Sequence, residues 1–269
     1  TSARQTDAPF VALLDPDYEE KMVLTPESTA EEIAATQPDV VLLKSFMRES
    51  LGSSLETLGI PVVYLHLESV EEYQKELDVL GTILGAPERA QEVWNYYEAQ
   101  MAQIDEGLAD LDHADRPTLL LFQYKTRGAQ NALEVPPAGY IQTEMVRTIQ
   151  ADTLWLNATR PGGWSVVNLE QIAAWDPEKI VVISYFDPVD EVVERLSNDP
   201  TWQALSAVQN NQLYGFPVDY YSWDQPDTRW ILGLTWLAQT LHPDQFPDLD
   251  MGAEIIEFYG ELYGLDAET

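Results

Sequence analysis

PERAQEVWNYYEAQMAQIDEGLADL, residues 87 to 111, carries a helical pattern that no glycine interrupts before Gly107. Pro87 suits the first turn of a helix, because it has no N–H to leave unpaired and its φ is already helical. Apolar residues that recur in steps of three and four lie on one helical face: they are Ala90, Val93, Trp94, Tyr97, Met101, Ile104, Leu108 and Leu111. Because strand–helix sequence flanks this stretch on both sides, we interpret it as a rigid strut between two lobes. An ordinary amphipathic helix within a single domain is the alternative.

An internal repeat lies on the two sides of this helix. EEIAATQPD at 31–39 precedes the apolar run 40–43, and EQIAAWDPE at 170–178 precedes the apolar run 179–183. In each copy a short helix carries Ile and Ala inward, and proline ends it. A buried parallel strand then follows. Repeats this far apart predict two similar α/β lobes rather than a solenoid.

The composition restricts the possible partners. The formal charge is −32, from 46 acidic and 14 basic residues, so a phosphate backbone would be repelled and nucleic acid is an unsuitable partner. The acidic composition is equally consistent with a protein from a saline habitat and with an ordinary acidic secreted protein. Cysteine is absent, which excludes disulfides and thiolate chemistry. No apolar run is long enough to span a membrane, and no signal peptide is visible.

The order of predicted elements gives the domain organisation. We expect an N-terminal α/β lobe at 1–86, the connecting helix at 87–111 and a C-terminal α/β lobe at 112–269. The first lobe is shorter and lacks its initial strand–helix unit. In the second lobe we expect a strand at 118–124 and a loop at 125–128. We also expect a helix at 200–208, and Asp227 as the cap of the helix that carries Trp230.

Ligands of open α/β sheets bind outside the carboxyl ends of the strands. This rule selects residues 44–48, 124–127, 185–186 and 220–224, which Trp164 joins through its loop. The set combines aromatic rings with four bases: Lys44, Arg48, Lys125 and Arg127. Such a combination suits a bulky, flat or chelated anionic ligand. Core packing of the rings and solvation of the bases are the alternatives.

The sequence contains little that indicates an enzyme. His66, His113 and His242 lie in unrelated segments without metal-ligand spacing, and there is no phosphate loop or nucleophile elbow. The acidic segment 15–20 lacks the glycine and spacing of a calcium loop, so it reads as a solvated turn. We therefore predict no catalytic residues, no metal site and no cofactor.

Together these features resemble the helical-backbone family of ABC-importer substrate-binding proteins, which bind ferric siderophores, haem and cobalamin. The resemblance covers nearly the whole chain. It rests on the repeat, the strut helix, LGIPVV at 58–63, Gly162-Gly163-Trp164 ahead of Glu170, and Ser222-Trp223-Asp224 followed by Arg229. It implies two Rossmann-like lobes clamped by one helix, with the ligand cleft between them.

The resemblance also implies residue roles. In the cobalamin and siderophore binders, the Glu that begins each repeated helix docks on arginines of the permease. The matching positions here are Glu31 and Glu170, whereas a helix-start acid favoured by the helix dipole is the alternative. Trp164 matches the pocket tryptophan of the cobalamin binder, and Trp223 and Asp224 fall on its closing loop. Arg229 matches the family in residue type, and a role in a buried ion pair is the alternative.

We thus expect an extracytoplasmic, monomeric solute-binding protein that delivers a ferric siderophore or related iron complex to an ABC permease. Binding of cobalamin, haem or an oxyanion such as molybdate is the alternative within this class. An enzyme or a sensor that uses the cleft is the alternative outside it. The candidate ligand-binding residues are Lys44, Phe46, Arg48, Tyr124, Lys125, Arg127, Trp164, Tyr185, Tyr220, Tyr221, Trp223, Asp224 and Arg229.

Overall fold

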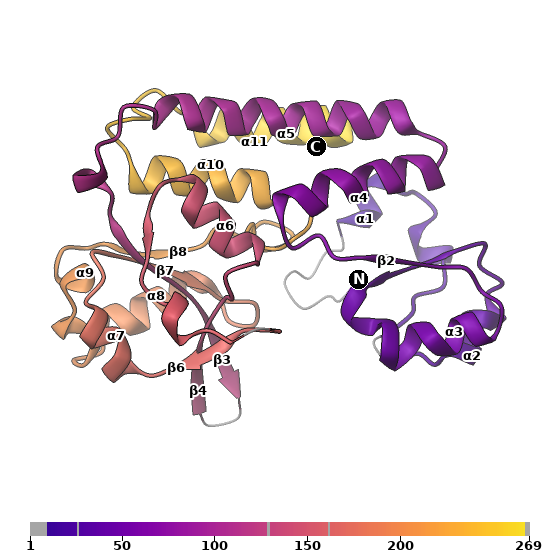
Figure 1. The fold of residues 1–269 in the computed structure, drawn as a ribbon, viewed down its shortest axis with the longest axis horizontal. Helices are drawn as coiled ribbons and strands as arrows, with labels where there is room; N and C mark the ends of the chain where they lie inside the picture. Colours follow the sequence, from indigo (N-terminus) through magenta and orange to yellow (C-terminus); the bar gives the residue numbers. More distant parts are fainter. Residues whose placement is uncertain (1–9, 26, 128–129, 161, 267–269) are drawn as a thin grey trace.

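A computed structural model describes residues 10–25, 27–127, 130–160 and 162–266, with the side chains of residues 127 and 130 excepted. A two-stranded sheet and a six-stranded sheet lie side by side, and α5 runs along one side of the molecule past both (Figure 1). We call residues 30–83 the N-terminal region and residues 118–263 the C-terminal region. No helix in the described ranges combines the length and apolarity needed to cross a membrane.

Helix α5, Pro87–Gly107, is the helix expected from the opening pattern. Its buried residues are Ala90, Trp94, Tyr97, Gln100 and Ile104, so the steps of three and four do mark one face. The helix ends at Gly107, four residues earlier than predicted. A Cβ at this position would lie 2.5 Å from the ring of Phe246, so the close approach of that ring requires glycine here.

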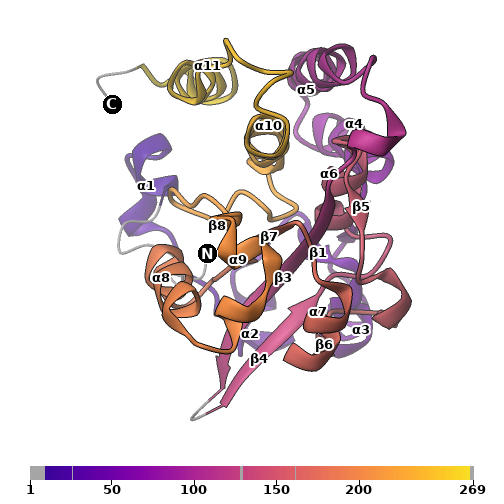
Figure 2. The ribbon, with the colours of Figure 1, turned by 90° about the vertical axis from the view of Figure 1, so that its left-hand side faces the viewer.

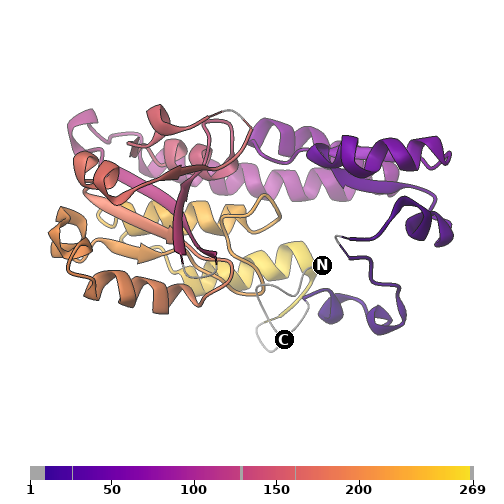
Figure 3. The ribbon, with the colours of Figure 1, turned by 90° about the horizontal axis from the view of Figure 1, so that it is seen from below.

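Tight packing joins α5 to both regions. Helix α4, Val70–Ile83, lies beside α5 (Figures 1 and 3), and a Cβ at Gly81 would come within 2.6 Å of the Ala90 Cβ. On the other side Tyr97 stacks on Trp230 of α10, with ring centroids 5.2 Å apart. Tyr73 of α4 meets Tyr97 edge to face, and their hydroxyls are 3.2 Å apart. The strut is therefore fixed by aromatic contacts at its centre.

The N-terminal region contains one parallel pair of strands, β1 (Val41–Lys44) and β2 (Val62–Leu65). Between them lie a 3-10 turn at Ser45–Met47, a π-helical turn at Arg48–Gly52, and α3 at Ser53–Thr57. Preceding them are α1 (Val11–Leu14), a 3-10 turn at Tyr18–Glu20, and α2 (Ala30–Ala35). The buried cluster of this region consists of Ala30, Ile33 and Leu55 in the described part of the chain.

The C-terminal region contains a mixed sheet in the order β6-β4-β3-β7-β8, with β5 paired to the start of β3. Strands β3, β7 and β8 are parallel, whereas β4 is antiparallel to both β3 and β6. Helix α8 covers one face of the sheet, and α10 lies over the other, below the layer of α5 and α11 (Figure 2). The strands are β3 (Thr118–Arg127), β4 (Gln130–Val135), β5 (Asp152–Thr153), β6 (Ser165–Val167), β7 (Lys179–Ile183) and β8 (Leu213–Gly215).

The loop predicted at 125–128 is wrong for its first three residues. Strand β3 continues through Lys125 to Arg127 and pairs with β4, which pattern reading missed. Cross-strand pairing decides this extension: Lys125 lies opposite Ala132, and Tyr124 lies opposite Leu133. Gly128 lies outside the described residues.

The helices of the C-terminal region follow their patterns with one exception. They are α6 (Ile141–Thr148), α7 (Leu169–Trp175), α8 (Val189–Asn198), α9 (Ser206–Gln209), α10 (Trp230–Leu241) and α11 (Met251–Tyr263), with 3-10 turns at His113–Asp115, Leu156–Ala158 and Trp202–Ala204. The helix expected at 200–208 is divided, because Leu205 is extended with ψ at 140° between the 3-10 turn and α9.

The repeated segments fold alike. The Thr29 side chain accepts a hydrogen bond from the Glu32 N–H, and the Glu32 carboxylate accepts one from the Thr29 N–H. Asn168 and Gln171 form the same reciprocal capping box at α7. Glu31 and Glu170 therefore both occupy the second position of their helix.

Candidate functional site

The chain after β2 makes a tight turn toward the C-terminal region. Leu67 has φ +57°, and the Glu76 carboxylate accepts hydrogen bonds at 2.7 Å from the N–H groups of His66 and Leu67. The first N–H of α4, at Val70, donates to Glu144 of α6 over 2.8 Å. A carboxylate from the C-terminal region thus caps a helix of the N-terminal region, and the turn is held at the junction of the two.

Lys44 and Glu68 meet at this junction. The Lys44 ammonium lies 3.1 Å from the Glu68 carboxylate and also donates to the His66 carbonyl. Across the junction, burial raises the pKa of Tyr140, and the negative charge of Glu68 raises it further. Glu68 acts in the same direction on the pKa of Tyr185. The charge of Glu68, just after β2, therefore acts on two tyrosines of the other region.

Behind Tyr185 lies a fully buried carboxyl group, Asp224. It accepts hydrogen bonds from the Tyr185 hydroxyl at 2.5 Å, the Ser222 hydroxyl at 2.5 Å and the Gln142 amide at 3.1 Å. Burial raises the pKa of Asp224, and the three donors oppose that rise without a cation beside it in the described structure. The Gln142 side-chain oxygen is buried and has no donor among the described residues.

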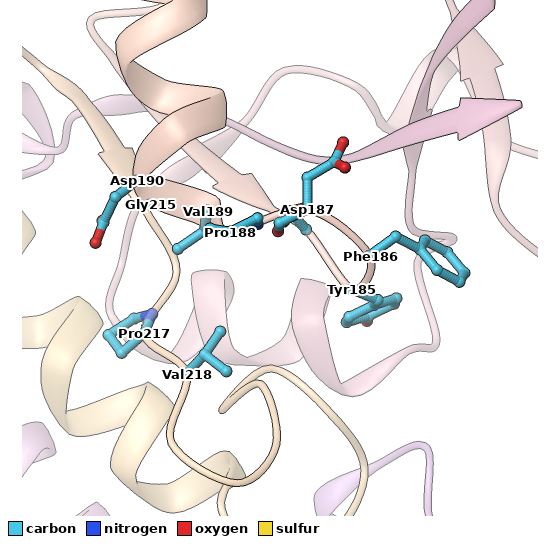
Figure 4. Close-up of a pocket in the computed structure, with 10 residues that line it drawn as sticks. Tyr185, Phe186, Asp187, Pro188, Val189, Asp190, Gly215, Pro217 and Val218 are labelled. Carbon is cyan, nitrogen blue, oxygen red and sulfur yellow. The ribbon is translucent and has the colours of Figure 1, made fainter. Parts of the chain in front are cut away.

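A cavity of about 590 Å³ opens beside Tyr185, at the carboxyl ends of β7 and β8 (Figure 4). Apolar side chains form much of its wall, and Phe186 is 52 % exposed. Its lining residues are Ser184, Tyr185, Phe186, Asp187, Pro188, Val189, Asp190, Gly215, Pro217 and Val218. The volume lies in the range of pockets that enclose drug-sized organic ligands.

Two predicted residues lie at this site: Tyr185 lines the cavity, and Asp224 accepts a hydrogen bond from its hydroxyl. Lys44 does not line the cavity and is paired with Glu68. A second predicted group lies apart from the cavity. Arg229 is 2 % exposed and donates a hydrogen bond to Asp219 at 2.8 Å. Its guanidinium carbon lies 4.5 Å from the centroid of the Phe10 ring. Tyr221 lies on the same guanidinium, and Tyr220 packs on Phe10 at 5.1 Å.

Arg229 is thus fully engaged within the fold. Burial alone would lower its pKa, but Asp219 and Asp227 raise the pKa above its ordinary value. The predicted cap of α10 is wrong in its geometry: Asp227 accepts from the Arg229 N–H, and Arg229 itself stands at the N-cap position without a side-chain cap.

A third predicted group lies along β3 instead of in a loop. Tyr124 is buried, with the Arg195 guanidinium carbon 5.5 Å from its ring centroid. Lys125 pairs with Glu134 of the neighbouring strand at 3.6 Å. The side chain of Arg127 lies outside the described residues.

The remaining predicted ligand residues differ in exposure. Phe46, just after β1, is 80 % exposed, whereas Arg48 lies over the ring of Tyr64 at 3.6 Å and 3.8 Å from the Glu56 carboxylate. Trp164 is half-buried at the edge of the C-terminal core. Trp223 is buried in that core, and its indole N–H has no acceptor in the described structure.

The two predicted docking acids are exposed. Glu31 on α2 and Glu170 on α7 lie in different regions, on the side of the molecule away from α5 (Figure 1). Among the described residues, neither carboxylate has a side-chain hydrogen bond or ion pair. They remain available for an external cation.

Sequence reasoning missed several residues of the site: Glu68, Tyr140, Gln142, Asp187 and Asp190. Glu68 and Asp187 follow strand ends, so the strand-end rule could have found them. Gln142 is placed by the burial of α6, which the sequence does not mark. In the described parts of the chain, no three His, Asp or Glu side chains are placed to hold a metal ion.

Comparisons with known proteins agree with this geometry. The family model described as "Periplasmic binding protein" matches residues 13–220. The molybdate-binding protein MolA of Haemophilus influenzae is 22 % identical over 254 residues, which cover 87 % of this chain and 69 % of MolA. Its molybdate-bound structure matches with a TM-score of 0.76 at 18 % identity, over 95 % of this chain and 82 % of that one.

Two further relatives extend the comparison. A periplasmic solute-binding protein from Veillonella parvula matches with a TM-score of 0.76 at 26 % identity, over 97 % of this chain and 78 % of that one. The vitamin B12-binding protein of Pectobacterium atrosepticum is 25 % identical over 153 residues, 56 % of this chain and 53 % of that protein. The chain thus shares the α/β fold of these binding proteins over nearly its full length.

Proposed function

Because the chain belongs to the periplasmic binding protein family, we propose that it captures a ferric siderophore or a related iron complex outside the cytoplasm. It is a solute-binding component of an ABC transporter and not an enzyme. The ligand is held between the two regions and then presented to the permease, and the protein works as a monomer.

The observation that carries this proposal is the cavity beside Tyr185. Its volume of about 590 Å³ and its exposed phenylalanine suit a large ligand with an apolar body. A free tetrahedral oxyanion is small, and it is bound best by converging N–H and guanidinium groups. Of the four predicted bases, the three whose side chains are described, Lys44, Arg48 and Lys125, instead lie beside carboxylates.

Molybdate is the second candidate, because the relative MolA binds it. Vitamin B12 is the third, through the relative from Pectobacterium. A titration followed by tryptophan fluorescence, with ferric siderophores of each chelate type, haem, cobalamin and molybdate, separates these candidates. Saturable binding of a ferric siderophore supports the proposal, and saturation by molybdate alone contradicts it.

We assign the delivery step to Glu31 and Glu170, which are the same helix position in the two regions. These two exposed carboxylates, one in each region, would form ion pairs with basic residues at two points of the permease surface. Replacing Trp164 by Ala should weaken ligand binding about tenfold or more, through the loss of a stacking surface. Glu170→Ala should leave binding unchanged and reduce uptake by whole cells.

Each variant serves as the control for the other, because Trp164→Ala should change ligand affinity and Glu170→Ala should change only uptake. Equal effects of Trp164→Ala and Glu170→Ala on ligand affinity would contradict this division between binding and delivery. Glu88, an exposed acid in the first turn of α5, provides a matched variant whose loss should alter neither property.

A further inference from the structure

The charge of the ligand can be inferred from which groups at the site still lack a partner. Three of the four bases expected there are already engaged in the structure. Lys44 pairs with Glu68 at 3.1 Å, Lys125 with Glu134 at 3.6 Å, and Arg48 lies 3.8 Å from Glu56. An anion would therefore compete with a built-in carboxylate at each of them.

The cavity itself offers negative charge. Asp187 and Asp190 are the charged residues among its ten lining residues, and none of the ten is basic. Figure 4 shows both carboxyl groups on the loop and helix start that follow β7. Asp187 accepts a hydrogen bond at 3.0 Å from Thr126, a neutral donor, and no base among the described side chains pairs with it. The wall also includes the apolar side chains of Phe186, Pro217 and Val218.

The layer behind the cavity adds an independent observation. Tyr185 links the cavity to Asp224, which has only neutral donors around it. Gln142, whose amide donates to Asp224, is a buried residue, and its side-chain oxygen lacks any donor in the described structure. The carboxylates of Asp187 and Asp190 at the cavity, and the layer of Asp224 and Gln142 behind it, thus present acceptors and negative charge. Hydrogen-bond donors or positive charge would complement these groups.

We propose that the ligand of this cavity carries a net positive charge: a cationic metal chelate whose apolar body lies on Phe186 and whose charge lies near Asp187 and Asp190. This inference rests on the proposed function, which it sharpens from iron chelates in general to cationic ones. It also explains how the cleft differs from one made for an anion such as molybdate. Electrostatic complementarity supplies the selectivity, and apolar contact supplies most of the affinity.

A charge series on one scaffold tests the proposal. Ferrioxamine B is a trihydroxamate chelate whose terminal amine gives it one positive charge at pH 7. Its N-acetyl derivative is neutral, and its N-succinyl derivative carries one negative charge. Titration at low constant salt should give affinities that fall from cation to neutral to anion, by about three- to tenfold per step.

The double variant Asp187→Asn and Asp190→Asn should reduce the ratio of cation affinity to anion affinity at least tenfold. Asp105→Asn with Asp110→Asn removes the same charge from exposed positions on and just after the end of α5, and it should leave that ratio within about twofold. Thermal melting of both double variants shows that each is folded before the ratio is read.

The outcomes separate the two proposals. Equal binding of the three chelates, tightest binding of the anion, or an equal change in both double variants would overturn the charge assignment and leave iron-chelate transport standing. Binding of molybdate without binding of any chelate would overturn the proposed function itself. Absence of binding by all four probes counts against both.

Discussion

The two regions of this protein differ in how many side chains they bury. In the described structure the cluster of the N-terminal region has three buried side chains, Ala30, Ile33 and Leu55, around a two-stranded sheet. The C-terminal region packs a continuous core on both faces of its six-stranded sheet, including Phe122, Trp155 and Trp230. A small unit buries little apolar surface, so it has little stability of its own.

The difference indicates how the N-terminal region stays folded. It relies on α4, whose Tyr73 packs on Tyr97 and Trp230, and on the Glu144 bond to Val70. Regions with few buried contacts open most readily. The small region is therefore the half suited to adjust when a ligand enters, while the large region presents a preformed cavity.

The largest expected effects come from core truncations in the two regions. Phe122→Ala, beside Trp202, should lower the free energy of unfolding by about 3–5 kcal/mol, and Leu55→Ala by about 2–4 kcal/mol for the N-terminal region alone. Hydrogen exchange measured by mass spectrometry should show faster exchange in residues 30–65 for Leu55→Ala, with β3 and β7 unchanged. Faster exchange throughout the chain would mean that the two regions unfold as one unit.

The contact between the regions can be weakened directly. Glu144→Gln keeps an acceptor for the Val70 N–H but removes the charge that assists the bond, at a cost of about 1–2 kcal/mol. Exchange at residues 66–73 should rise more than elsewhere. Glu88→Gln, an exposed helix-start acid without a partner in the other region, is the matched control and should leave that segment unchanged.

The matched capping boxes allow the same change in each region. Thr29→Ala and Asn168→Ala each remove one side-chain cap, at about 1 kcal/mol. We expect Thr29→Ala to accelerate exchange around α2 without changing the urea midpoint of the C-terminal region, and Asn168→Ala to lower that midpoint. A lower midpoint for the C-terminal region in both variants would remove the distinction.

A pH dependence of stability belongs to the large region. Burial raises the pKa of Asp227 to about 6, above its ordinary value of about 4. The folded state then holds this proton more tightly than the unfolded chain, so its contribution to stability is present below pH 4 and is lost between pH 4 and 6.

Thermal unfolding between pH 4 and 6.5 checks that dependence. The melting temperature of Asp227→Asn should fall less steeply with rising pH than that of the parent protein. Asp110→Asn, at an exposed position, accounts for the general repulsion of a chain with a charge of −32. An identical slope in parent and Asp227→Asn would show that Asp227 titrates normally.

Much of the local structure followed from pattern. The steps of three and four residues predicted α5, the hydroxyl and early acids at 28–32 predicted the start of α2, and the strand 62–65 agrees with its apolar run. These signals depend on neighbours in the sequence. Where pairing with a distant strand decided the outcome, as at Lys125 to Arg127, a polar stretch read as a loop was in fact strand.

The candidate site shows the same division. Strand-end position selected Lys44 and Tyr185 as candidates, but it did not indicate their partners, which are Glu68 for Lys44 and Asp224 for Tyr185. The domain boundaries, the ligand and the roles of the individual site residues stay predictions.

The sequence by itself determined the long helix and the start of α2, because helical periodicity and capping depend on neighbouring residues. The class of protein followed from the resemblance of its motifs to a known family. Only the tertiary structure decided which of the predicted bases are paired. Glu68 and Glu134 pair with Lys44 and Lys125, which composition alone had suggested for an anion, and Asp187 lines the cavity. Electrostatic energy depends on distances of a few ångström, which a linear sequence does not contain.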